Sequence, residues 1–99
     1  MPEHPLNTLS EIDPKFMEAL GGLDDLIYGD GALPRKVKLL IALAFDAAHG
    51  ADQGVRSLAK SAIQEGATLQ EIAEAVRVAY HLAGVGSLYT ASKGLKDLV

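Results

Sequence analysis

Two histidines are the side chains in this sequence best suited to acid–base chemistry. His49 follows Asp46 by three residues, so on a helix both lie on one side and the carboxylate could orient a general acid or base. His81 follows Tyr80, and if Tyr80 faces the core, His81 lies about 100° further round, lining a cleft or a subunit interface. We favour structural roles: His49 as a cation at a helix carboxyl terminus and His81 as a hydrogen-bonded histidine.

The sequence offers neither a set of metal ligands nor a phosphate-binding loop. It has three histidines, far apart, and no cysteine; Asp46 and His49 have the spacing of helical metal ligands, but one such pair alone is weak evidence for a metal site. Gly84-Val85-Gly86 follows an expected helix instead of a strand, which is the wrong context for dinucleotide binding. We therefore predict no metal and no other cofactor.

A basic group, Arg35, Lys36 and Lys38, opens an expected helix, where cations oppose the helix dipole. Three interpretations account for it: pairing with the aspartates between residues 24 and 30, binding of an anionic small molecule, or simple solvation. We favour solvation and keep the three cations as candidate anion-binding residues.

Helices must position all of these groups, because the sequence contains no useful run of alternating apolar residues. Asp13-Pro14 marks a helix start, and Gly21-Gly22 is expected to stop that helix. Residues 1–10, which hold two of the four prolines, are expected to form an extended arm. The expected helices cover residues 14–20, a further turn or two at 23–28, then 34–48, 52–65 with Asp52 as cap, 69–83 and 86–98.

The helix over residues 34–48 is apolar nearly all round and is expected to be the core, buried on several sides. Its expected inner face holds a series at helical spacing, namely Val37, Leu40, Ile41, Ala44, Phe45 and Ala48. Thr68-Leu69-Gln70-Glu71 is a capping-box pattern and the clearest local signal in the chain. The helix that it opens carries a stripe that includes Val76, Ala79 and Tyr80.

Length and charge narrow the function classes. The 99 residues, 48% of them hydrophobic, make one domain that is small enough to favour a homo-oligomer. A net charge of −4 and a pI near 5.2 argue against nucleic acid as partner. With no apolar run of bilayer length and no signal-peptide pattern, we expect no membrane partner and a cytoplasmic location.

Three stretches resemble the AhpD-like, carboxymuconolactone decarboxylase family: residues 33–44 (LPRKVKLLIALA), 65–68 (EGAT) and 70–76 (QEIAEAV). The resemblance covers about half of the chain, with a family core over residues 33–86 of a single domain 1–99. It implies an all-α, AhpD-like bundle of about five to six helices that assembles as a trimer or hexamer.

In redox-active members of this family, a Cys-x-x-Cys pair opens the helix after the central one, and a histidine and a glutamate complete a proton relay. The resemblance places these four positions at Ala51, Gly54, Leu58 and Leu39. None of the four side chains can supply a nucleophile or an exchangeable proton. We therefore expect a degenerate site without dithiol peroxidase or disulfide reductase activity.

The leading hypothesis is an oligomeric protein that binds a small molecule, such as a small organic acid, or serves assembly. The alternative is a cysteine-independent decarboxylase or isomerase acting on a small organic acid, with Asp46, His49 or His81 as weak catalytic candidates. A third hypothesis is a partner subunit for a paralogue that retains the cysteines.

Overall fold

The computed structural model describes residues 6–98, which form helices and connecting turns and contain no strand. The all-α prediction is therefore confirmed. Six helices follow one another along the chain: α1 (Asn7–Ile12), α2 (Pro14–Tyr28), α3 (Arg35–Ala48), α4 (Asp52–Gln64), α5 (Leu69–Ala83) and α6 (Gly86–Leu95). No helix in this described part is long and apolar enough to cross a membrane.

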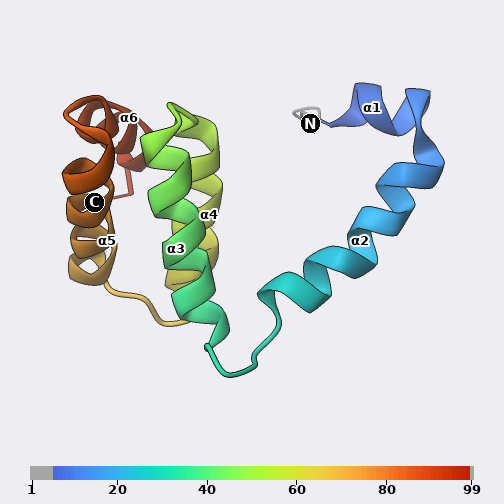
Figure 1. Cartoon of the computed structure of the whole chain (residues 1–99), viewed down its shortest axis with the longest axis horizontal. Coiled ribbons are helices and arrows are strands. Elements are labelled where there is room, and N and C mark those ends of the chain that lie inside the picture. The colour runs from blue at the N-terminus through green and yellow to red at the C-terminus, as the bar shows by residue number, and fades with distance from the viewer. Residues whose placement is uncertain (1–5, 99) are drawn as a thin grey trace.

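The helices divide into a bundle and an arm. Helices α3 to α6 pack together, whereas α1 and α2 project away from them, joined to α3 by the segment 29–34 (Figure 1). No residue of α1 or α2 is buried. Near the end of α2, Tyr28 packs against the cluster around Leu39, so the arm touches the bundle at its base.

The arm differs from the sequence-based expectation in two ways. Gly21-Gly22 does not stop a helix, since α2 runs unbroken from Pro14 to Tyr28. Asp13 caps it as predicted, accepting the backbone N–H of Phe16 at 3.2 Å. The expected extended arm over residues 1–10 is wrong for residues 7–10, which belong to α1, and its first five residues lie outside the described part.

Small side chains let the bundle helices approach closely. Its main core cluster combines Leu43, Val55 and Ile72 with four buried alanines. Gly94 on α6 is also buried, and a Cβ there would lie 2.8 Å from Cβ of Val55 on α4. The absence of a side chain at position 94 therefore permits the contact between α4 and α6.

The central helix α3 is covered on one side only within this chain. Its buried residues are Leu39, Leu43 and Ala47, whereas Ile41 and Phe45 are 44% and 61% exposed. The expectation that α3 is buried on several sides, with Ile41 and Phe45 inward, is therefore wrong for the single chain. A helix that is apolar all round carries no signal for which side turns inward.

Other helix boundaries shift by a few residues. Asp52 was expected to cap α4, but the cap is Ala51, without a side-chain hydrogen bond, and Asp52 is the first helical residue. The final helix ends at Leu95 instead of residue 98. Tyr80, expected on the inner stripe of α5, is exposed, while Val76 and Ala79 of that stripe are buried.

Candidate functional site

A largely apolar cleft of about 480 Å³ opens between the end of α2, helix α3 and helix α4. The arm supplies one wall through the last two residues of α2, and α3 supplies most of the floor. Two of the lining side chains are charged, Lys38 and Asp46. The lining consists of Ile27, Tyr28, Lys38, Ile41, Ala42, Phe45, Asp46 and Leu58.

Lys38 is held at the α2–α3 connection, because its Nζ donates a hydrogen bond to the carbonyl oxygen of Gly29 at 2.6 Å. An ammonium group has three N–H donors, so two remain for another partner. Asp46 lies two turns further along α3, about 12 Å away at 1.5 Å per residue, too far for a direct ion pair. The cleft therefore presents a cation and an anion at separate places.

Asp46 also sets the packing of α3 on α4. A Cβ placed on Gly54 would collide with the carboxylate of Asp46, with Cγ only 2.8 Å away. The carbonyl oxygen of Asp46 accepts the N–H of Ala51 at 2.9 Å, which closes the turn between the helices. Glycine fits at position 54 because it has no side chain, and the carboxylate of Asp46 occupies the space that a side chain would fill.

The other two predicted relay positions are packed with hydrocarbon. Leu39 is buried in a small cluster with Ala62 and Ala67, and Leu58 packs against the same cluster while also lining the cleft. Leu39 on α3 and Leu58 on α4 therefore belong to the same apolar packing region. Neither can move a proton.

The structure does not bring the two predicted catalytic histidines into the cleft. His49 ends α3 as its C-cap, where its exposed ring lies 6.2 Å from that of Phe45. His81 is exposed on α5. Within residues 6–98, no hydrogen bond or ion pair joins His49 to Asp46.

The three cations of the predicted anion site take separate partners. Arg35 pairs through Nε with Glu65 at 3.2 Å, and Lys36 pairs with Glu71 at 3.0 Å. Of the aspartates between residues 24 and 30, Asp30 reaches this region and accepts the backbone N–H of Arg35 at 2.7 Å. Lys38 is thus the member of the group that lines the cleft.

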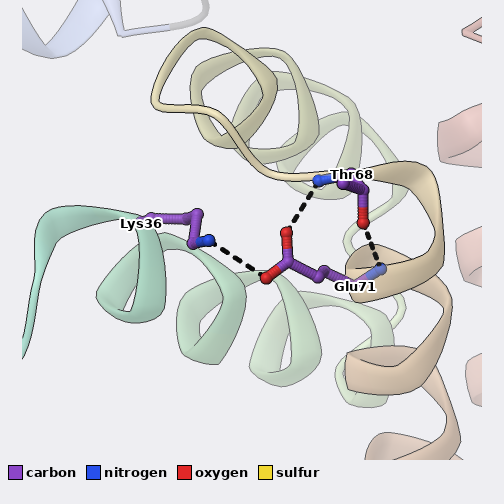
Figure 2. A network of polar contacts seen from close by, with 3 residues as sticks. All are labelled: Lys36, Thr68 and Glu71. Atoms are coloured by element: carbon purple, nitrogen blue, oxygen red, sulfur yellow. Dashed lines mark hydrogen bonds and ion pairs between the residues drawn. The ribbon is translucent and has the colours of Figure 1, made fainter.

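Glu71 joins the start of α5 to α3 (Figure 2). Its Oε1 accepts the N–H of Thr68 at 2.9 Å, and the Thr68 hydroxyl accepts the N–H of Glu71 at 3.0 Å, so the predicted capping box is confirmed. The backbone hydrogen bond from Thr68, followed by the hydrogen bond from Lys36, lowers the pKa of Glu71 from its ordinary 4.5. This network is structural, since Glu71 lies outside the cleft lining.

Comparison with known proteins decides the family. The sequence profile of the carboxymuconolactone decarboxylase family matches residues 14–97, which is α2 through α6. The chain belongs to the carboxymuconolactone decarboxylase family. Its fold is also that of a member from Legionella pneumophila, whose apo crystal structure superposes with a TM-score of 0.82 at 27% identity, over 92% of this chain and 81% of that one.

Two uncharacterised proteins are similar over most of their length. One, from Methanocaldococcus jannaschii, is 26% identical over 99% of this chain and 92% of its own. The other, from Cupriavidus necator, is 32% identical over 88% of this chain and 77% of its own. As a carboxymuconolactone decarboxylase family protein without a single cysteine, this chain has no thiol peroxidase activity.

Ile27 and Tyr28 were not predicted from the sequence as site residues. They form the wall of the cleft on the side of the arm. The Tyr28 ring also lies 5.9 Å beneath the Arg35 guanidinium, which helps to hold the end of α2 against α3. The signal was present: Leu20, Leu23 and Ile27 keep helical spacing across Gly21-Gly22. Among residues 6–98, no group of three or more histidine, aspartate or glutamate side chains could hold a metal ion.

Proposed function

We propose that this protein is a homo-oligomeric, small-molecule-binding member of its family whose ligand is a small organic acid with an apolar body. The observation that carries the proposal is the placement of Lys38 at the edge of an otherwise largely apolar cleft. An apolar pocket with few, fixed polar groups is the usual form of a small-molecule site. The lysine would bind the carboxylate, and Ile27, Ile41 and Phe45 would cover the body.

The correspondence of Ala51, Gly54, Leu58 and Leu39 with the redox positions supports binding over thiol chemistry. Gly54 has no room for a side chain beside Asp46, and the two leucines fill the remaining space. Of these four positions, Leu58 lines the cleft, so the ligand would meet hydrocarbon where a redox-active relative carries the relay histidine.

A cysteine-independent isomerase or decarboxylase is the second candidate, because Asp46 supplies a proton acceptor in the same cleft as the cation. Both candidates share Lys38 as the carboxylate-binding group. They differ in turnover. An enzyme would convert the bound acid and lose that activity in Asp46→Asn, which keeps the shape and removes the base. A binding protein would show binding without turnover in both forms.

The test titrates the labelled protein with benzoate as probe and with benzamide as its neutral counterpart. Binding is monitored by the amide chemical shifts of the protein. We expect benzoate to shift the signals of cleft residues, and Lys38→Met to weaken its binding about tenfold, since a hydrogen bond to a charged group contributes about 1.5 kcal/mol or more. Lys60→Met, at an exposed lysine of α4 outside the lining, is the matched control. Equal binding of benzoate by the Lys38 and Lys60 variants would refute the role of Lys38.

A further inference from the structure

The ligand cleft carries a second charged group besides the lysine that would bind the carboxylate. Asp46 and Lys38 are the two charged side chains of the lining, and both are half-buried. Within residues 6–98, no hydrogen bond or ion pair reaches the Asp46 carboxylate. Asp52, which is also half-buried, pairs with Lys93 at 3.8 Å. Asp46 is therefore an uncompensated anion in a cleft with largely apolar walls.

A purely apolar ligand body is disfavoured at this end of the cleft. Covering a carboxylate without giving it a cation or a hydrogen-bond donor costs free energy, because the group loses its water and gains no partner. Asp46 directly follows Phe45 on α3, and both residues line the cleft. A ligand body that covers Phe45 therefore also reaches Asp46, where it needs a donor.

A cationic donor fits this end of the cleft better than a neutral one. A hydrogen bond between an ammonium group and a carboxylate is shorter and stronger than a bond between neutral groups. Phe45 is 61% exposed, and the face of an aromatic ring attracts a cation. The cation of the lining, Lys38, is held at the carbonyl oxygen of Gly29 and does not reach Asp46. The ligand itself must therefore bring the positive charge.

The spacing of the two charged residues sets the length of the ligand. Lys38 and Asp46 lie about 12 Å apart along the axis of α3, and both side chains lean toward the start of the helix, which roughly preserves this offset. Charge-assisted hydrogen bonds of about 2.8 Å at the two ends leave roughly 6–9 Å for the ligand. An extended chain covers about 1.2 Å per bond, so roughly six to eight bonds separate the charged ends of the ligand.

We infer that the ligand is an ω-amino acid whose carboxylate binds Lys38, whose primary ammonium group binds Asp46 and whose apolar spacer lies on the floor of the cleft. Opposite charges at the two ends of the site also fix the direction in which such a molecule binds. Asp46 is then a specificity-determining residue that selects against a plain carboxylic acid of equal size. The inference rests on the proposed function, and it makes Asp46 a binding group instead of a base.

The test compares two ligands of equal size built on the benzoate probe. In 4-(aminomethyl)benzoate the ammonium nitrogen is six bonds, or about 7 Å, from the carboxyl carbon, and 4-ethylbenzoate carries a methyl group in place of the ammonium. Titrations of the labelled protein, monitored by amide chemical shifts, give a Kd for each ligand. We expect the amine to bind about five- to tenfold more tightly, because its half-buried partner lies between an exposed and a buried carboxylate.

Two variants assign this preference to one carboxylate. Asp46→Asn keeps the size of the side chain and removes its charge, so we expect it to bind benzoate at least as tightly as the unaltered protein and to lose the preference for the amine. Asp52→Asn makes the same change of charge outside the cleft lining, and as the matched control it keeps the preference. Far-UV circular dichroism verifies that both variants are folded.

The outcomes separate this inference from the proposed function. Equal or tighter binding of 4-ethylbenzoate by the unaltered protein would overturn the inference, as would a preference for the amine that persists in Asp46→Asn. Benzoate binding that depends on Lys38 would stand in either case. If benzoate did not bind, or bound equally to the Lys38 and Lys60 variants, the proposed function and this inference would fail together.

Discussion

Replacing Gly94 by alanine places a methyl group where α6 crosses the start of α4. The new Cβ would lie 2.6 Å from the carbonyl oxygen of Asp52 and 2.8 Å from Cβ and Cγ1 of Val55. Ordinary carbon contacts are at about 3.5–4.0 Å. One obstacle is backbone and the other is a side chain with no exposed surface, so neither can yield without moving a helix.

The expected magnitude is a loss of about 2 kcal/mol in the free energy of unfolding: overpacking costs about 3 kcal/mol at the upper end of its usual range, and the better helix propensity of alanine returns about 1 kcal/mol. For a domain of this size the melting temperature falls by roughly 8–16 °C. The sign is opposite to the one that helix propensity alone predicts.

Urea and thermal unfolding, followed by circular dichroism at one fixed protein concentration, measure this loss. Gly86→Ala is the matched control, because Gly86 belongs to the same helix and has nothing within 4 Å of its Cβ position. It should be neutral or slightly stabilising. A Gly94 variant as stable as the Gly86 variant would refute the assigned close contact between α4 and α6.

Two further predictions concern the start of α5. Thr68→Ala removes the cap of Glu71 N–H and should cost about 1 kcal/mol in urea unfolding, whereas Thr68→Ser should retain most of the stability. Because the pKa of Glu71 is lower in the folded chain than its ordinary 4.5, its contribution is present above pH 4.5 and is lost as the pH falls through the lowered value. Stability measured from pH 6 to pH 2 should therefore fall less steeply in Glu71→Gln, and an unchanged slope would show that Glu71 gains nothing from Thr68 and Lys36.

Helix starts that depend on a side-chain cap could be predicted from the sequence. Asp13-Pro14 and Thr68 with Glu71 act within one turn, so their capping depends on local geometry alone. Gly21-Gly22 was misread, because a cost of about 1 kcal/mol per glycine weakens a helix without ending it.

The direction in which α3 faces could not be predicted. Leu39, Leu43 and Ala47 are as apolar as Ile41 and Phe45, so the sequence pattern does not distinguish the inner side from the outer. The choice depends on how α4, α5 and α6 pack, which is a property of the whole chain.

The site was predicted in part. Residue type singled out Asp46 and Lys38, and the structure places both in the cleft, although they were assigned to different sites. Residue type also singled out His49 and His81, which the structure leaves exposed. Tyr28 was missed because its place in the cleft depends on the path of the whole α2 helix.

The close approach of Asp46 to Gly54 bears on how this lineage could change. If positions 51 and 54 descend from a dithiol pair, a cysteine reintroduced at 54 meets a carboxylate that already fills its volume, so Asp46 must turn away or be replaced first. If the site has this origin, the loss of the side chain at position 54 was accompanied by a carboxylate that now occupies its space.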